Sequence, residues 1–216
     1  MTPKQEFYKL TAKKVLLGFE KRQIEGYYCE NYSDAVKKAL SLMDKDSSIS
    51  WGGSETLKEI GLLEALKDGE NSIHNYTLLD RDLAKSPKEV EDIYHKALSC
   101  DYYLMSSNAI TLDGKLVNID GNGNRIAALI YGPKNVIVIA GMNKIAPDLD
   151  AALTRVRSFA SPINSIRLNK GTPCSSKGNC HNCLSPDSIC CQILVTRMSR
   201  NPNRIKVILV GEELGY

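Results

Sequence analysis

The sequence predicts an α/β protein in which a mostly parallel sheet is flanked by helices. Segments with the character of strands alternate along the chain with segments whose apolar residues recur at helical spacing. The run NVIVIAG (135–141) is apolar throughout, which is typical of a parallel strand buried on both faces. Glycine-rich turns follow several predicted strands and precede predicted helices. Together these observations favour crossover helices on both faces of one sheet.

The first quarter of the chain predicts two helices followed by a strand, a turn and a third helix. Apolar residues keep helical spacing over about 6–23 and again over 33–45, where Ser33 is the expected N-cap. SSISW (47–51) alternates small and apolar residues as a strand does. Two glycines end it, and the helical period resumes over 54–68.

The strand-then-helix order continues in the next segment. HNYTLL (74–79) has the residue types of a strand. A helix is expected over 86–99, with Ser86 as its cap and Pro87 at its first position, where proline is favoured. CDYYLMSS (100–107) then predicts another strand.

The second half predicts a hairpin and the remaining strands and helices. AITLDGKLVNID (109–120) predicts two antiparallel strands that turn at Asp-Gly. A short helix is expected over 124–132, and the buried strand 135–141 follows it. A helix over about 147–158 and a last strand within 204–216 complete the pattern.

Composition limits the classes of function. The 216 residues are 43% hydrophobic and 25% charged, which is ordinary for a folded protein, and we expect one domain over 1–216. A net charge of +3 without a dense Lys/Arg block does not suggest a nucleic-acid partner. No run approaches the ~18 apolar residues of a membrane span, and the first residues lack the apolar core of a signal peptide. We therefore expect a cytoplasmic protein that does not contact a membrane.

Ligands of open α/β sheets bind at the carboxyl ends of the strands, where this sequence places its glycine-rich turns. SWGGSET can offer free backbone N–H groups to an anion, or it can be a tight turn with Ser54 as a helix cap. NIDGNGNR lacks the third glycine of a dinucleotide fingerprint. The candidate ligand-binding residues, for a small anionic metabolite, are Gly52, Gly53, Ser54, Asn108, Asp120, Gly121, Gly123, Asn124 and Arg125.

Arg125 stands out in the second turn because a cation at a helix start opposes the helix dipole. It is expected either to contact an anionic ligand or to pair with Asp120. Asp113 and Asp120 could serve as acid and base, but aspartate before glycine is most often a turn residue. The sequence alone assigns no catalytic residue.

Five of the seven cysteines lie between residues 172 and 192, a segment that we interpret as an insertion (171–192) before the last strand. In a reducing cytosol such a cluster favours a metal site over structural disulfides. The expected ligands are Cys174, Cys180, Cys183 and Cys190, and the two-residue spacing of Cys180 and Cys183 is the strongest element. An iron–sulfur cluster fits the uneven spacing somewhat better than zinc, which stays the alternative. Free thiols or a redox disulfide are the remaining interpretation, and spacing cannot separate Cys190 from Cys191 as a ligand.

Three segments resemble one known family. SWGGSETLKEIGLLEAL, SSNAITLDGKLVNIDGNGNRIAALIYGPKNVIVIAGMNKI and the ending KVILVGEELGY are similar to the LUD domain, or lactate-utilisation, family. The resemblance implies a fold like that of ribose-5-phosphate isomerase and the CoA transferases (NagB/RpiA-like). It also implies a role in oxidising L-lactate to pyruvate with iron–sulfur partner proteins. Some family members carry a similar cysteine run, whose pattern matches Cys190 and not Cys191.

Two functions are therefore expected from the sequence. The first is a redox accessory subunit of lactate or 2-hydroxy-acid utilisation that carries an iron–sulfur cluster. The alternative is a transferase- or isomerase-like enzyme, or a metabolite-binding protein, that holds an anionic substrate in its glycine-rich turns and a structural zinc on the cysteine loop.

Overall fold

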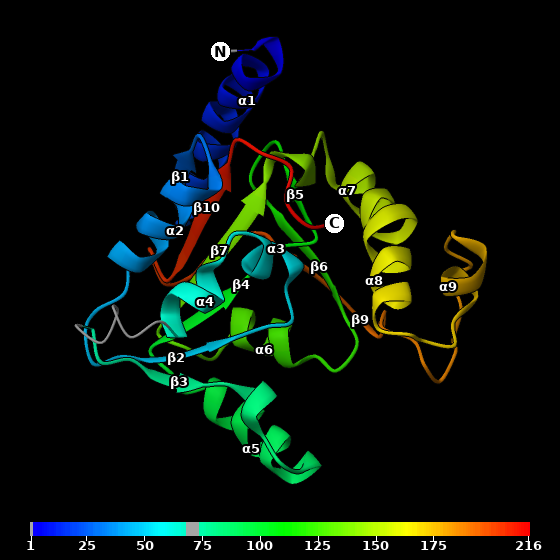
Figure 1. Ribbon diagram of the computed structural model, residues 1–216. Coiled ribbons are helices and arrows are strands. Elements are labelled where there is room, and N and C mark those ends of the chain that lie inside the picture. The colour runs from blue at the N-terminus through cyan, green and yellow to red at the C-terminus, as the bar shows by residue number, and fades with distance from the viewer. Residues whose placement is uncertain (1, 68–73) are drawn as a thin grey trace.

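The computed structural model describes residues 2–67 and 74–216 and is built around a six-stranded sheet in which every neighbouring pair is parallel (Figure 1). In spatial order its strands are β1 (Glu25–Cys29), β10 (Ile205–Val210), β7 (Asn135–Gly141), β4 (Tyr102–Met105), β2 (Ser48–Trp51) and β3 (Thr77–Leu79). The predicted α/β fold with a mostly parallel sheet flanked by helices is confirmed.

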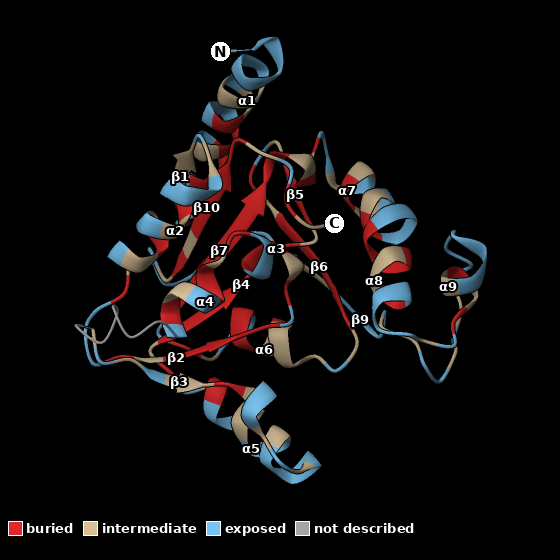
Figure 2. Cartoon of the chain, in the orientation of Figure 1, coloured by how far each residue is buried: buried red, intermediate tan, exposed pale blue. Residues whose placement is uncertain are grey.

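Helices cover both faces of this sheet (Figure 1). They are α1 (Pro3–Glu20), α2 (Tyr32–Ser41), α3 (Glu55–Glu59), α4 (Leu62–Lys67), α5 (Pro87–Ala97), α6 (Asn124–Ile130), α7 (Leu149–Arg155), α8 (Ser161–Arg167) and α9 (Pro173–Lys177). Helices α1 and α6 pack on one face, and α2, α3 and α4 pack on the other. The outer surfaces of the helices are exposed, whereas the central strands are buried (Figure 2).

Strand β7 divides the core between the two faces by the alternation of its side chains. Val136 and Val138 point into the cluster beneath α1 and α6, and Ile137 and Ile139 point into the cluster beneath α2, α3 and α4. All four are fully buried. Each contributes roughly 1.5–3 kcal/mol by leaving water, so this strand anchors the sheet.

A second, four-stranded sheet packs beside the first. Its order is β8 (Ile145–Ala146), β5 (Ala109–Thr111), β6 (Leu116–Asp120) and β9 (Gln192–Thr196). Strands β5 and β6 form the predicted hairpin, with Gly114 N–H donating to the carbonyl of Thr111. The sequence did not predict β8 and β9, because one has only two residues and the other begins with exposed residues.

Two glycines allow α1 to touch this hairpin. A Cβ on Gly18 would collide with the carbonyl of Asp113, and Gly114 has a φ of +89°, which favours glycine. The close approach lets Arg22 donate to the Asp113 carbonyl at 2.7 Å. The hairpin is therefore fixed against the helix that begins the chain.

Three local expectations were wrong. Strand β1 was not expected at all. The cap of α2 is Asn31, whose side chain accepts from Asp34 N–H, and not Ser33. The helix expected over 54–68 divides into α3 and α4 at Gly61, whose φ is +73°, and its last expected residue, Asp68, lies outside the described residues. The caps at Ser54 and Ser86 are confirmed.

The helix expected over 147–158 is longer than predicted. After α7 the chain makes a π-helical segment (Val156–Ala160) and continues directly into α8. Pro162 is accommodated in the first turn of α8, where its missing N–H is tolerated. This extension carries Arg167 to the edge of the main sheet. Within the described residues, no helix has both the length and the apolar character needed to cross a membrane.

Candidate functional site

A polar cleft lies where the strands of the main sheet end. Its walls come from the loops that follow β2, β4, β6 and β7, from α8, and from the segment 186–189 of the cysteine loop. The carboxyl ends of parallel strands are the usual ligand site of open α/β sheets. The cleft therefore occupies the position that the glycine-rich turns predicted.

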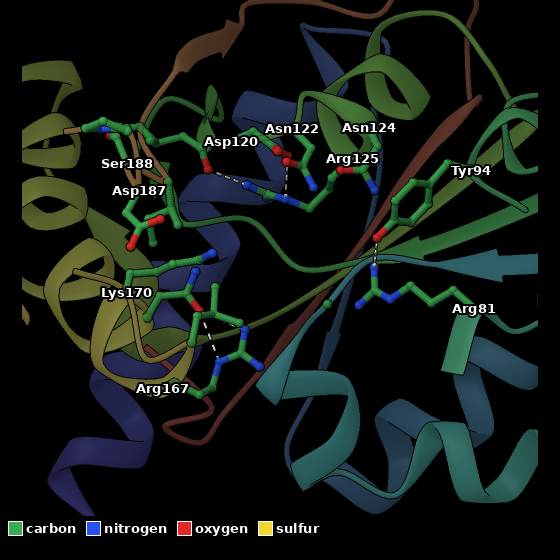
Figure 3. A pocket seen from close by; sticks show the side chains of 17 residues that line it. Arg81, Tyr94, Asp120, Asn122, Asn124, Arg125, Arg167, Lys170, Asp187 and Ser188 are labelled. Atoms are coloured by element: carbon green, nitrogen blue, oxygen red, sulfur yellow. Dashed lines mark hydrogen bonds and ion pairs between the residues drawn. The ribbon is translucent and has the colours of Figure 1, made fainter. Parts of the chain in front are cut away.

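The cleft consists of two adjoining cavities. The outer cavity, of about 490 Å³, is lined by Gly53, Arg81, Asp120, Arg167 and Lys170 among others (Figure 3). The inner cavity, of about 80 Å³, reaches toward the buried ends of β4 and β7. The cavities share a wall, whose residues are Gly53, Ile119, Arg125, Asn164 and Arg167.

Arg125 holds this shared wall together. Its Nε donates to Asp120 Oδ2 at 3.2 Å. One terminal nitrogen donates to Asn118 Oδ1 and the Ser106 carbonyl, and the other to Asn108 Oδ1 and the Ile119 carbonyl, at 2.6–3.3 Å. The five acceptors match the five N–H groups of a guanidinium. Arg125 thus pairs with Asp120, one of its two expected roles, and braces the wall.

The first glycine turn packs against two arginines. A Cβ on Gly52 would stand 3.2 Å from the Arg125 side chain, and one on Gly53 would stand 2.8 Å from Arg81. A larger residue at either position would push the neighbouring arginine side chain aside. Ser54 Oγ accepts from Leu57 N–H at 3.3 Å, so it caps α3 as one of the two sequence interpretations proposed.

The second turn is organised by Asp120. Its Oδ1 accepts from Gly123 N–H at 2.9 Å, and Gly123 has a φ of +83° as the N-cap of α6. Asn124 begins that helix and lines the outer cavity. A Cβ on Gly121 would stand 3.2 Å from Ile189 Cα, so this turn packs directly on the cysteine loop.

The structure brings together seven of the nine candidate ligand-binding residues at the cleft. They are Gly53, Ser54, Asn108, Asp120, Gly121, Asn124 and Arg125. Gly52 and Gly123 do not line it and instead support the two turns. That these residues bind a ligand stays a prediction.

Cations that the sequence did not single out surround the cleft. Arg167 and Lys170 lie on one side of the outer cavity and Arg81 on the other (Figure 3). Arg81 is held near Tyr94, whose hydroxyl is 3.4 Å from it, and Arg167 pairs with Glu55 at 2.9 Å. No sequence motif marks them, because Arg81 follows β3 whereas Arg167 and Lys170 stand at and just after the end of α8, in a distant part of the chain.

The full set of charges is unbalanced. The two cavities are lined by the cationic side chains Arg81, Arg125, Lys144, Arg167 and Lys170 and by the acidic side chains Glu55, Asp120 and Asp187. Five cationic against three acidic groups leave the lining positive when Lys144 is protonated. A concave site of this kind raises the local concentration of small anions.

Lys144 closes the inner end of the cleft and is the main residue that the sequence analysis missed. It lies at the end of the turn after β7, in the segment IAGMNK, and only 3% of its surface is exposed. Its Nζ donates to Thr56 Oγ1 at 2.9 Å and to Ser106 Oγ at 3.0 Å. Burial, followed by the charges of Arg155 and Arg125, lowers its pKa to about 7, against a smaller opposite effect of Glu59.

The cysteine loop begins in α9 and ends at β9. Cys174 is buried, with Sγ 3.2 Å from Thr172 Oγ1, whereas Cys180 and Cys190 are exposed and Cys183 is half-buried. All seven cysteines are free thiols. In residues 2–67 and 74–216, no three His, Cys, Asp or Glu side chains are grouped closely enough to hold a metal ion.

The thiols of the loop lie on one stretch of chain. Cys190 is exposed as a residue, but partial shielding of its sulfur from water raises the pKa of its thiol, against an opposite effect of the Ser161 hydroxyl, and the charges of Cys174, Cys180 and Cys183 add to the rise. Cys191 instead donates to the carbonyl of Ser188 in its own turn, at 3.4 Å. The four expected ligands lie on one loop, and soft thiolate donors suit zinc or an iron–sulfur cluster. The kind and number of these donors fit such a group, although the four sulfur atoms are not close enough together to coordinate one metal ion in this structure.

Comparisons with solved structures concern the fold. A DUF162 family protein from Deinococcus radiodurans has a TM-score of 0.49 at 13% identity, over 95% of this chain and 98% of that one. eIF2B delta from Chaetomium thermophilum has a TM-score of 0.36 at 17% identity, over 56% of this chain and 51% of that one. Ribose 5-phosphate isomerase from Plasmodium falciparum has a TM-score of 0.35 at 11% identity, over 54% of this chain and 52% of that one. All three TM-scores are below 0.5, so none of these neighbours bears on function.

Sequence comparison is more informative about the family. Comparison with curated proteins found no match. The model of the LUD domain, in contrast, matches residues 12–210, which include both sheets, every wall of the cleft up to Ile189 and the whole cysteine loop. A match over nearly all of the chain decides the assignment, and it agrees with the resemblance in the glycine-rich turns. The chain belongs to the LUD domain family.

Proposed function

We propose that this protein acts in the utilisation of lactate or a related 2-hydroxy acid and binds a small carboxylate in the cleft. Membership of the LUD family supports a role related to lactate utilisation. The observation that carries the binding proposal is the excess of cationic side chains around a concave, polar site at the carboxyl ends of the strands. A cytoplasmic location goes with this role.

Arg167 is the expected carboxylate partner. It lines both cavities, and a guanidinium can donate two parallel hydrogen bonds to one carboxylate. Arg125 is less suited to this task, since its donors already serve five protein acceptors. Lys170 adds positive charge on the same side of the outer cavity (Figure 3).

Calorimetric titration with L-lactate and pyruvate tests the proposal. We expect both anions to bind and the uncharged amide of lactate not to. Arg167→Met should weaken binding by roughly tenfold or more, the equivalent of ~1.4 kcal/mol, because a charge-assisted pair is lost. Arg157→Met is the matched control, since Arg157 is exposed on the same helical stretch and does not line the cleft. Equal binding of lactate and its amide would contradict the proposal.

The same titration distinguishes the proposed function from the alternative that the sequence left open. A transferase- or isomerase-like protein would prefer a sugar phosphate or a CoA ester to lactate. Tighter binding of either of those ligands, with the same dependence on Arg167, would favour the alternative.

We also propose that Cys174, Cys180, Cys183 and Cys190 hold an iron–sulfur cluster, with zinc as the alternative group. The position of all four thiols on one stretch of chain, from α9 to the start of β9, supports the set. The N–H of Asn182 donates to Cys180 Sγ at 3.4 Å, so the turn between Cys180 and Cys183 holds that sulfur in place. A bound cluster would supply one-electron transfer, consistent with iron–sulfur partner proteins of lactate oxidation.

Metal analysis of anaerobically purified protein tests this proposal. We expect iron and sulfide in equal amounts with broad absorption near ~400 nm. Cys180→Ser should abolish the absorption, whereas Cys191→Ser, the adjacent control, should keep it. Zinc alone in the protein would make the loop structural. Equal loss in both variants would refute the assignment of Cys190 as the fourth ligand.

A further inference from the structure

Lys144 is a buried lysine. Among the residues that the structure describes, no Asp or Glu forms an ion pair with it. Its amine reaches only the hydroxyls of Thr56 and Ser106. A buried ammonium is normally paired, because an unpaired charge in the interior is costly. The surroundings of Lys144 therefore favour a neutral amine.

Most of the charged groups around the amine act in the same direction as its burial. Arg155 from α7 and Arg125 from α6 disfavour the ammonium, and only Glu59 from α3 opposes them. Glu55 and Arg167, which line the same cavity, pair with each other at 2.9 Å. With a pKa of about 7, amine and ammonium coexist at neutral pH. Desolvation and neighbouring cations are the two means by which proteins make lysine nucleophilic.

The position of the amine gives it access to a ligand. Lys144 lines the inner cavity, which shares Arg125 and Arg167 with the outer cavity. A carboxylate held at Arg167 would direct the rest of a small ligand toward Lys144. Hydroxyls on two sides of Nζ can accept and return protons during a reaction.

We propose that Lys144 is a catalytic nucleophile that condenses with the carbonyl carbon of a 2-oxo acid bound in the cleft. This inference rests on the proposed binding of a small carboxylate and specifies the reactive form of the ligand. A 2-oxo acid has the carbonyl that the reaction needs, whereas a 2-hydroxy acid has none.

The condensation balances without a further reactant. The nitrogen lone pair forms a bond to the carbonyl carbon, and the π electrons move to the oxygen. Ser106 and Thr56 relay a proton from nitrogen to that oxygen, which gives a carbinolamine. The second proton of the nitrogen then follows the same relay to the hydroxyl as the C–O bond breaks, so water leaves and a neutral imine joins Lys144 to the acid. Nothing is oxidised or reduced.

Reductive trapping tests the inference on the full-length protein. Pyruvate and borohydride should give one adduct, which peptide mapping places on Lys144, and L-lactate should give none. Lys144→Met should abolish the adduct, and Lys134→Met, an exposed control, should retain it. The yield should rise through about pH 7, where the buried amine loses its proton, and not only near ~10, as an ordinary lysine would require.

The outcomes separate this inference from the proposed function. Pyruvate that binds in calorimetry but leaves no adduct on Lys144 would overturn the inference and leave carboxylate binding intact. Adducts spread over exposed lysines would also overturn it. If neither pyruvate nor lactate binds, both proposals fail. Peptide mapping locates the adduct on the wild-type protein, so the test does not depend on whether Lys144→Met folds.

Discussion

Replacing Arg125 by methionine is expected to lower the free energy of unfolding by roughly 3–5 kcal/mol, as measured by urea denaturation. The change removes five hydrogen bonds at once and leaves the nearly buried carboxylate of Asp120 without its cation. Asn118, which is fully buried, also loses the shorter of the two hydrogen bonds to its side-chain oxygen and keeps the 3.3 Å bond from Asn108 N–H. Unsatisfied buried acceptors are the costly part of the change.

A double variant separates the charge from the hydrogen bonds. Arg125→Met together with Asp120→Asn should lose less stability than the sum of the single changes, because no unpaired carboxylate remains. Arg125→Lys should recover little, since one ammonium cannot serve acceptors spread around a planar fork. Arg157→Met, on an exposed surface, should change stability by less than ~0.5 kcal/mol. An Arg125→Met protein as stable as the wild type would refute the bracing role.

Replacing Lys144 by methionine is expected to raise the free energy of unfolding at neutral and acidic pH, whereas Arg125→Met lowers it. The folded-state pKa of about 7 lies below the ordinary lysine value of 10.5, so folding disfavours the proton that the unfolded chain binds. The stability that the folded protein loses by burying protonated Lys144 is largest below about pH 7, and this loss disappears as the pH rises toward ~10.5. Since each pKa unit corresponds to about 1.4 kcal/mol, the variant should gain several kcal/mol.

The difference between wild type and variant is the quantity to measure. Urea denaturation at several pH values should give a stability advantage of Lys144→Met that shrinks from about pH 6 to about pH 10. Other titrating groups contribute to both proteins and largely cancel. The lost bonds to Thr56 and Ser106 lower the advantage equally at every pH, by about 1 kcal/mol each. A constant difference would show that Lys144 titrates like an exposed lysine.

The sequence predicted the main sheet because its strongest signals are local. The run 135–141 is apolar at almost every position, and Ser54, Ser86 and Pro87 mark helix starts by their own chemistry. Strand β1 was missed because all five of its residues are half-buried, so no alternation of apolar and polar residues distinguishes it. Its strand character depends on β10, which lies far away in the sequence.

The site was predictable only in part, for a related reason. The glycine turns lie directly after strands, and parallel strands end at the same edge, so local signals located the cleft. The burial of Lys144 cannot be read locally, because Thr56, Ser106 and Gly215 surround it from distant segments. Arg167 and Lys170 reach the cleft only because the π-helical segment and α8 extend the helix beyond its expected end. The residue types of a turn do not show whether the rest of the chain buries it, so the sequence did not single out Lys144.

The order of the main sheet has a consequence for biosynthesis. Within the part of the chain that the structure describes, strand β1 pairs with β10 alone, and β10 separates it from β7. During translation, β7, β4, β2 and β3 can associate first, while β7 keeps an unpaired edge and β1 waits. A chain in that state presents an open strand edge and uncovered apolar surface, which favour aggregation. The pairing of β10 is therefore the event that covers the edge of β7 and joins β1 to the rest of the sheet.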